Sequence, residues 1–182
     1  MNKKILIALA LIVVIVGITI VLGSFVNSET DQLSTGLSYH SSVCVYKNNE
    51  LVQCSPNALT NAGKNALRSY AAHGGTLAAF DYIALANNTP EGNHAVTDTD
   101  LDNRTTCCGL TIAQGTVTDL ATDGNWTISK VFTCATEAVS EVNATGIFNA
   151  SSPGTYFAYN TFSPVDLQID DQINVTWTIW VT

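Results

Sequence analysis

The carboxyl-terminal stretch "DQINVTWTIWVT", residues 171–182, alternates apolar and polar side chains along its whole length. Successive side chains of a β-strand point to opposite faces of a sheet, so the alternation predicts a strand with one buried face. The face predicted to be buried carries Ile173, Val175, Trp177, Ile179 and Val181. The face predicted to be polar carries Asn174, Thr176, Thr178, Trp180 and Thr182.

Short segments of the same kind precede this strand and are separated by turn residues. They are "FDYIAL" (80–85), "LTIAQGTV" (110–117), "NWTISKVFTC" (125–134), "TGIFNA" (145–150) and "TYFAYNTF" (155–162). The last two flank the turn "SSPG", Ser151–Gly154. Short strands at this spacing predict a mainly β fold, an antiparallel, jelly-roll-like β-sandwich.

One segment has helical periodicity instead. In "SPNALTNAGKNALRSYAAHGG", residues 55–75, apolar residues recur at steps of three and four between Leu59 and Ala71. Thr60 is a candidate cap, and Gly74 and Gly75 end the pattern. The spacing predicts one short amphipathic helix.

The stretch "VCVYKNNELVQC", Val43–Cys54, predicts a hairpin closed by a disulfide between Cys44 and Cys54. A turn at Asn48–Glu50 would place Tyr46 opposite Val52 and Lys47 opposite Leu51. Opposed residues of a non-hydrogen-bonded pair are close enough for such a bond. The disulfide requires a compartment in which thiols are not kept reduced.

The amino terminus predicts export. Two lysines precede an apolar run of eighteen residues from Ile5 to Leu22. This is a signal peptide, residues 1–23, cleaved after Gly23, or an uncleaved membrane anchor, since the run is just long enough to span a bilayer. Either reading sends the rest of the chain out of the cytoplasm, so we expect a secreted, cell-surface protein.

The exported part is acidic. The chain has 7 basic and 15 acidic residues, and removal of the two leader lysines leaves 5 − 15 = −10. The remaining basic residues are scattered, so no patch exists to neutralise phosphates, and nucleic acid is not an expected partner. Contact with a membrane is expected only through an uncleaved leader.

Three further cysteines stand at Cys107, Cys108 and Cys134. We predict a bond between Cys108 and Cys134 on neighbouring strands, which leaves Cys107 over. An odd cysteine outside the cell indicates a bond between chains, a buried thiol or, here, a disulfide within the vicinal pair.

Six Asn-X-Ser/Thr sequons are candidate N-glycosylation sites. They lie at Asn87, Asn103, Asn125, Asn143, Asn149 and Asn174. They indicate a glycosylated surface protein, with ordinary polar strand and turn residues as the alternative.

No segment matches a catalytic or metal-binding motif. "DTDLD", Asp98–Asp102, begins like a calcium loop, but Asn103 and Gly109 stand where such a loop has glycine and glutamate. His40, His73 and His94 lack zinc spacing, and there is no nucleophile elbow or phosphate loop. We therefore expect no enzyme activity, no catalytic residues, no metal and no cofactor.

Four segments carry a resemblance to a known family. "LTNAGKNALRSYAAHGG", "YIALANNT", "DTDLDN" and "GIFNASSPGTYFAYNTFSPVDLQIDDQINVTWTI" occur in that order between Leu59 and Thr182. They resemble small β-sandwich proteins that tailed bacteriophages encode among tail and appendage genes, with relatives in archaea. The resemblance implies a structural domain without catalytic residues.

The front of the chain is similar instead to secreted archaeal filament subunits of the thread and bundling-pilus type. In that group an amino-terminal extension inserts as a strand into the next subunit. The resemblance implies that residues 24–42 form a donor arm, with Leu33, Leu37 and Tyr39 pointing inward, ahead of a domain at 43–182.

The sequence thus predicts a structural subunit that assembles with itself, head to tail, into a cell-surface filament used in adhesion. Donor-strand complementation would join the subunits, because a strand added to an open sheet edge completes its ladder. The alternatives are a membrane-anchored adhesin that binds glycans or other cells, and a virus-encoded tail or appendage protein.

Overall fold

The computed structural model describes residues 38–73, 78–87, 94–152 and 154–181. All of them belong to one compact unit, Leu37–Thr182. The predicted leader and most of the predicted arm, including Leu33 and Leu37, lie outside the described residues.

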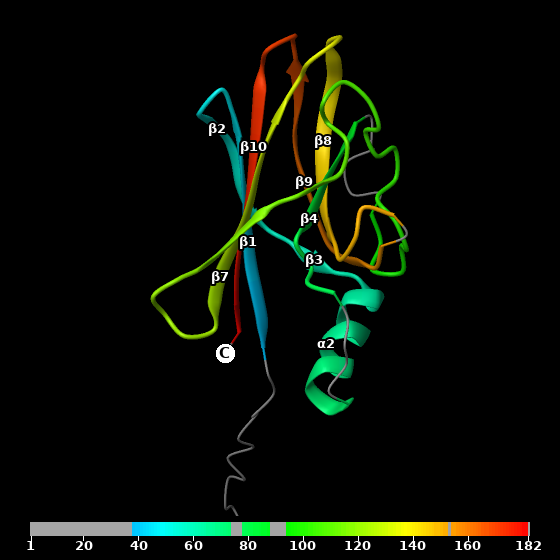
Figure 1. The fold of residues 1–182 in the computed structure, drawn as a ribbon, viewed down its shortest axis with the longest axis vertical. Helices are drawn as coiled ribbons and strands as arrows, with labels where there is room; N and C mark the ends of the chain where they lie inside the picture. Colours follow the sequence, from blue (N-terminus) through cyan, green and yellow to red (C-terminus); the bar gives the residue numbers. More distant parts are fainter. Residues whose placement is uncertain (1–37, 74–77, 88–93, 153, 182) are drawn as a thin grey trace, which may run out of the picture. The chain divides into compact units, whose positions relative to one another are not determined.

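The described residues form a mainly β fold of two five-stranded antiparallel sheets and one short helix, as the sequence predicts (Figure 1). The first sheet has the order β2-β1-β10-β7-β6, and the second β3-β9-β8-β4-β5. The strands of the first sheet are β1 (Tyr39–Lys47), β2 (Glu50–Pro56), β6 (Thr116–Asp119), β7 (Asn125–Thr133) and β10 (Gln172–Val181). Those of the second are β3 (Ala58–Leu59), β4 (Tyr82–Asn87), β5 (Ala113–Gln114), β8 (Val139–Phe148) and β9 (Tyr156–Leu167).

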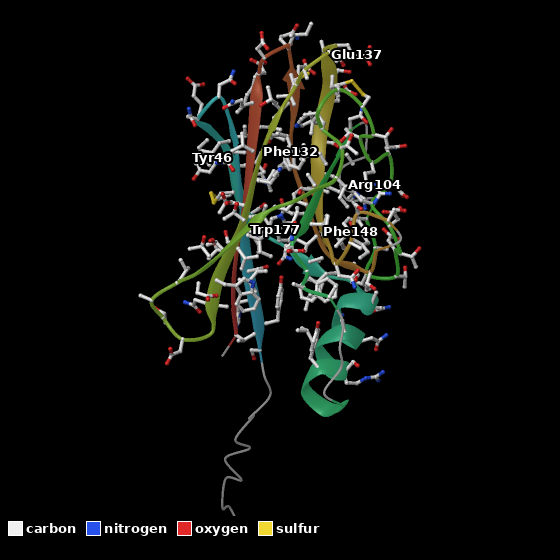
Figure 2. All side chains as sticks on the ribbon, in the orientation of Figure 1. Tyr46, Arg104, Phe132, Glu137, Phe148 and Trp177 are labelled. Atoms are coloured by element: carbon white, nitrogen blue, oxygen red, sulfur yellow. A yellow bond between two sulfur atoms is a disulfide. The ribbon has the colours of Figure 1, made fainter. Side chains whose placement is uncertain are left out.

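Strand β10 is central, paired with β1 on one side and β7 on the other. Its burial alternates as predicted, with the side chains from Ile173 to Ile179 buried at every second position. Trp177 is fully buried, and it lies with Phe132 of β7 between the sheets (Figure 2). One core cluster joins these residues to Ile83 and Ile147 of the second sheet, so the two sheets share a core.

The hairpin of β1 and β2 has the predicted disulfide but a different turn. Cys44 lies opposite Cys54 and is bonded to it. The turn has only two residues, Asn48 and Asn49, both with positive φ (49° and 68°). Tyr46 therefore faces Leu51, not Val52, and a bulge between Val45 and Tyr46 absorbs the shift. Two asparagines favour this turn because asparagine tolerates positive φ.

Strand β1 begins earlier than the sequence predicts. Tyr39 pairs with Val181 of β10, so residues 39–42 belong to the domain and not to a donor arm. The Tyr39 ring packs edge-on against Phe157 at 5.8 Å between centroids. The prediction of Tyr39 as a donor-strand residue is therefore wrong, and the arm can extend no further than about Ser38.

The predicted helix is confirmed as α2 (Asn61–His73). Thr60 caps it, since its Oγ1 accepts a hydrogen bond from the Gly63 amide at 2.9 Å. A side chain at Gly63 would overlap the carbonyl oxygen of Phe157, so the glycine lets the helix approach β9 closely. The apolar positions Ala66 and Leu67 then lie buried and half-buried on its inner side.

Two strands are longer than their sequence patterns. Strand β8 starts at Val139 and β9 continues to Leu167, past Pro164. Register shifts between Val139 and Ala144 interrupt the β8–β9 ladder there. These bulges interrupt the alternation of buried and exposed side chains, so the pattern does not predict where the strands begin and end.

Candidate functional site

Strand β6 is the open edge of the first sheet. It pairs with β7 on one side, and among the described residues no strand pairs with its other side. All four of its residues are exposed, including Val117, which is 48% exposed. An open strand edge is a template for another strand unless it is protected.

The opposite edge strand, β2, is linked to the second sheet by side chains. The Ser163 amide of β9 donates to Gln53 Oε1 at 2.9 Å, and Asn160 Nδ2 donates to Ser55 Oγ at 3.0 Å. The chain then crosses directly from β2 through Asn57 into β3 of the second sheet. The two edges of the first sheet therefore differ, because β2 is partly buried and linked to β9, whereas every residue of β6 is exposed.

An apolar groove of about 270 Å³ lies beside this open edge. The sheet residues that line it come from β6, β7, β10 and β9, and the other wall comes from α2 and the segment before β4. The lining residues are Leu67, Tyr70, Ala79, Phe80, Val117, Trp126, Ile128, Phe157 and Ile179. None of them is charged, so the groove suits apolar side chains.

Packed aromatic rings line the base of the groove. Phe80 stacks on Phe157 at 4.5 Å between centroids, and Tyr39 packs edge-on against Phe157. Phe157 is buried, whereas Tyr70 is 39% exposed at the rim. The start of β1 therefore contacts a residue that lines the groove.

The sequence analysis did not identify these residues as a site. Val117, Trp126 and Ile128 belong to segments that the sequence predicts only as strands. The segment predicted as one strand, "LTIAQGTV" (110–117), is instead divided between β5 and β6, which belong to different sheets. Strand β6 is therefore short and leaves part of the longer β7 uncovered.

A second cluster of chemical interest contains sulfur. Cys107 and Cys108 form a vicinal disulfide, and Cys134 is a buried free cysteine. The predicted Cys108–Cys134 bond is therefore wrong, and Cys107 is not the residue left over. The two loops are nonetheless neighbours, because the Ala135 amide donates to the Cys108 carbonyl at 2.8 Å.

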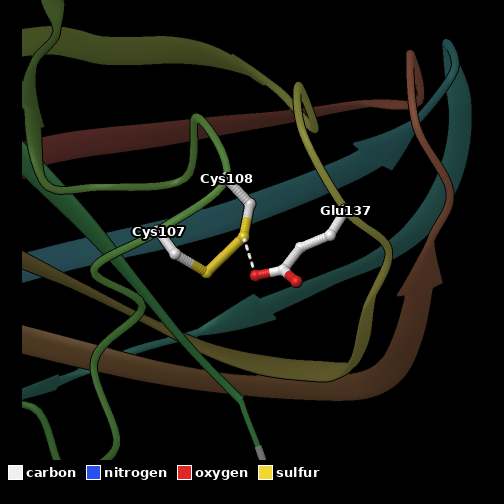
Figure 3. Close-up of side chains that lie close together, drawn as sticks. All are labelled: Cys107, Cys108 and Glu137. Atoms are coloured by element: carbon white, nitrogen blue, oxygen red, sulfur yellow. Dashed lines mark hydrogen bonds between the residues drawn. A yellow bond between two sulfur atoms is a disulfide. The ribbon is translucent and has the colours of Figure 1, made fainter.

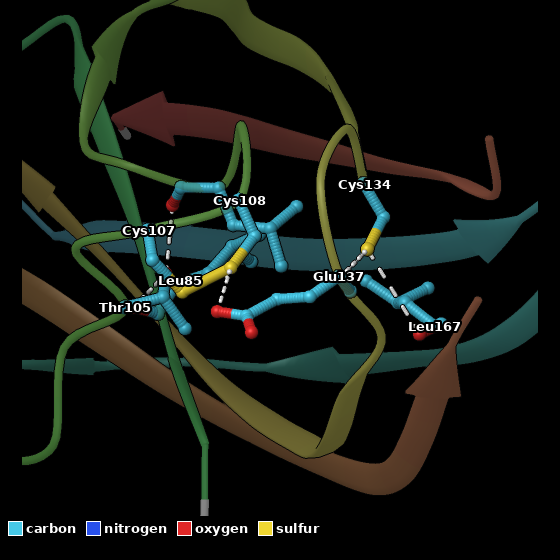
Figure 4. Close-up of a disulfide and its surroundings, with 8 residues drawn as sticks. Leu85, Thr105, Cys107, Cys108, Cys134, Glu137 and Leu167 are labelled. Atoms are coloured by element: carbon cyan, nitrogen blue, oxygen red, sulfur yellow. Dashed lines mark hydrogen bonds between the residues drawn. A yellow bond between two sulfur atoms is a disulfide. The ribbon is translucent and has the colours of Figure 1, made fainter. Parts of the chain in front are cut away.

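Glu137 lies between these sulfurs (Figures 3 and 4). Its Oε1 is 3.1 Å from Cys108 Sγ, and its backbone oxygen is 2.9 Å from Cys134 Sγ. Cys134 Sγ is also 3.9 Å from the Leu167 oxygen. The Cys134 thiol thus has its own backbone acceptors, apart from the carboxylate that faces the disulfide.

The six sequon asparagines differ in accessibility. Asn103 is exposed in a turn with φ of 53°, whereas Asn143 is only 8% exposed within β8. The others, Asn87, Asn125, Asn149 and Asn174, are half-buried. Asn149 is engaged, because its Oδ1 accepts a hydrogen bond from the Thr155 amide. Of the six asparagines, Asn103 is therefore exposed and Asn143 is shielded by the fold.

The acidic segment Asp98–Asp102 makes local hydrogen bonds. Asp98 Oδ2 accepts from the Ala95 amide at 2.8 Å, and Asp100 Oδ1 lies 3.3 Å from Arg104 Nη1. Within the described ranges, the one group of acidic, histidine and cysteine side chains close enough to share a metal is Cys107, Cys108 and Glu137. The aspartates thus do not converge on a cation site there.

Two buried polar groups lie near that segment. The His94 ring packs against Tyr159 at a tilt of 43°, and its Nδ1 is 3.6 Å from Asp98 Oδ2. Burial, and then the charge of Asp98, raises the pKa of the Tyr156 hydroxyl well above its usual range. Tyr156 therefore stays neutral, and its ring, stacked on Phe148 at 4.8 Å, serves packing.

Comparison of the chain with protein-family models, with curated proteins and with solved structures finds no match in any of the three. In the part of the chain that the structure describes, no helix is long and apolar enough to cross a membrane.

Proposed function

We propose that this protein is an extracellular structural subunit, a jelly-roll-like β-sandwich that polymerises head to tail by donating its amino-terminal arm to the next copy. The observation that carries the proposal is the uncharged groove beside the unpaired edge of β6. An inserted strand would add main-chain hydrogen bonds to β6 and place alternate side chains in the groove.

The arm, residues 24–37, has the chemistry of such an insert. Its apolar residues Leu33 and Leu37 are an even number of positions apart, so on a strand they share one face. It carries Glu29 and Asp31 and no basic residue. The helix that forms one wall of the groove carries the exposed residues Lys64 and Arg68 and no acidic residue, so the two charges are complementary.

Sheet geometry favours a neighbouring copy as the donor. A strand beside β6 would be four strand spacings from β1, about 19 Å away. Leu37 is two residues before Tyr39, and two extended residues span about 7 Å at most. A chain therefore cannot pair its own Leu37 with the open edge of β6 while β1 keeps its pairing with β10.

The resulting contact is heterologous, since one copy gives the arm and the other gives the groove. Such contacts propagate into open filaments unless they close into a ring. The donated strand would also protect the accepting copy from aggregation, because it covers an open strand edge to which other chains could pair.

The test compares the full-length protein with three variants by negative-stain electron microscopy. We expect filaments from the native chain and from Thr116→Glu, which changes the outward-facing neighbour in β6. We expect dispersed particles after deletion of residues 24–37 and from Val117→Glu, which puts a charge into the groove wall.

Dispersed particles from the native chain would contradict the proposal and favour a membrane-anchored adhesin. Filaments that persist in both the deletion and Val117→Glu would also contradict it, because assembly would then use another surface. Circular dichroism of each variant separates loss of assembly from loss of folding.

A further inference from the structure

The loop that carries the vicinal disulfide and the turn after β7 bring three metal-ligand atoms together. The two sulfurs of Cys107 and Cys108 and a carboxylate oxygen of Glu137 all lie within 4.8 Å of one another (Figure 3). Cys108 is 7% exposed, whereas Cys107 and Glu137 are exposed. The cluster is thus anchored on one side and open to solvent on the other.

The contact between Cys108 Sγ and Glu137 Oε1, at 3.1 Å, has an unusual chemistry. An ionised carboxylate is only an acceptor, and a disulfide sulfur carries no proton to donate. The two atoms can share a proton when Cys108 is a thiol or when the carboxyl is protonated. In the reduced pair, a Cys108 thiolate and the Glu137 carboxylate are close enough to share a cation.

Both loops are fixed by backbone hydrogen bonds. The Leu110 amide donates to the Cys107 carbonyl at 2.9 Å, and the Ala135 amide donates to the Cys108 carbonyl at 2.8 Å. A side chain at Gly109 (φ 81°) would overlap the Thr133 oxygen, so the loop lies tightly against the end of β7. The backbone that carries Cys107 and Cys108 is therefore held against the end of β7 by the fold and not by the disulfide alone.

We propose that reduction of the Cys107–Cys108 disulfide creates a binding site for a thiophilic divalent cation such as Zn²⁺, held by both thiolates and Glu137. A small-molecule dithiol supplies the two electrons: its two thiols become a disulfide while Cys107 and Cys108 become thiols. Binding of the cation then releases two protons, one from each thiol. The site is closed when the disulfide is formed.

The donor set determines the metal. Two thiolates and one carboxylate suit Zn²⁺ or Cd²⁺ better than Ca²⁺ or Mg²⁺, which prefer oxygen alone. Three protein ligands leave the fourth tetrahedral position to water on the exposed side. This site is independent of the strand-acceptor groove, so it would exist equally in a monomer.

The experiment uses the full-length protein with Cys44→Ser and Cys54→Ser, so that these accessible thiols do not compete. The protein is reduced with a dithiol, freed of it without air, and titrated with Cd²⁺ while the ultraviolet thiolate-to-cadmium absorption is recorded. We expect one Cd²⁺ per chain in the reduced protein and no such absorption in the oxidised protein.

Three variants in the same background test the ligands. Cys107→Ser should abolish the absorption, and Glu137→Gln, which keeps both sulfurs, should weaken binding by about 10- to 100-fold. Cys134→Ser is the matched control and should bind as the parent does, because its sulfur has separate contacts.

Absence of the cadmium band in the reduced parent would overturn the proposal. Equal binding by the parent and Glu137→Gln would overturn it as well, and so would loss of binding in Cys134→Ser with retained folding. Tryptophan fluorescence of the reduced parent checks that the core around Trp177 stays intact, and unfolding on reduction would count against a preformed site.

Discussion

At the scale of single residues, Thr60 joins the helix to the second sheet. It is fully buried, and its hydroxyl accepts from the Gly63 amide while facing the carbonyl oxygens of Tyr156 and Phe157. Its own amide also donates to the Phe157 oxygen at 3.0 Å. One side chain thus caps α2 and also forms a hydrogen bond with the backbone of β9. The sequence predicts the cap but not the contact with β9.

Thr60→Val should therefore lower the free energy of unfolding by more than the loss of a helix cap alone would. Loss of the cap costs about 1 kcal/mol, and a buried carbonyl left without its donor adds about 1–3 kcal/mol. We expect a fall in the free energy of unfolding of about 2–3 kcal/mol, measured by urea denaturation. Thr60→Ser keeps the hydroxyl and is the control. Equal losses for both variants would mean that methyl packing, not hydrogen bonding, is what Thr60 provides.

Asp171 makes the stability depend on pH. Hydrogen bonds from Asn48 Nδ2 and the Gln168 amide, together with Lys47 at 3.0 Å, lower the pKa of its carboxyl from 3.8 to about 2. A carboxyl whose pKa is lower in the folded protein than in the unfolded chain stabilises the fold at pH values above its unfolded pKa. That stabilisation is lost as the pH falls through the folded pKa.

We therefore expect thermal stability to fall between about pH 4 and pH 2, and the fall to be shallower in Asp171→Asn. Melting temperatures measured from pH 2 to pH 6 test this. Asp170→Asn is the matched control, since Asp170 has φ of 71°, which asparagine tolerates. If the melting temperatures of the native chain and Asp171→Asn fall in parallel with pH, then other carboxylates determine the acid dependence of stability.

At the scale of elements, the contact between α2 and β9 depends on a missing side chain. Alanine normally favours a helix by about 1 kcal/mol relative to glycine. At Gly63 the added Cβ would overlap the Phe157 oxygen, so the helix would have to move away from the sheet.

Gly63→Ala should thus destabilise the protein in spite of its better helix propensity, by about 1–3 kcal/mol as for other overpacked sites. Asn65→Ala, at an exposed position of the same helix, is the control and should be neutral or slightly stabilising. Chemical denaturation of the two variants gives the comparison. A more stable Gly63→Ala would mean that the helix can shift without loss of packing, including at the groove wall that Leu67 forms.

Elements with a regular pattern were predictable from sequence, and those set by tertiary contacts were not. The alternation in β10 and the three-to-four spacing in α2 each indicate an element with one buried face. Both elements could therefore be predicted from the sequence. The start of β8 and the end of β9 lie among bulges, where alternation fails. Cys44–Cys54 was predictable because its partners are on one hairpin, whereas the partner of Cys108 depends on how two distant loops meet.

At the scale of the whole molecule, the proposed strand donation would give an assembly a direction. Each copy would contribute one arm and one groove, and growth would require no other contact. A copy that has lost its arm can still accept, and a copy with a blocked groove can still donate. The two defects are therefore complementary, which is not true of a self-complementary dimer surface.

Mixing the two defective chains tests this directly. The chain without residues 24–37 and the Val117→Glu chain should each be monomeric and should form one-to-one dimers when mixed, with no filaments. Mass photometry of the separate and mixed samples measures this. Added in small amounts to native protein, each should shorten filaments, because each ends growth at one end only. Mixed dimers would assign donor and acceptor to different copies, whereas two samples that stay monomeric on mixing would rule out the pairing of this arm with this groove.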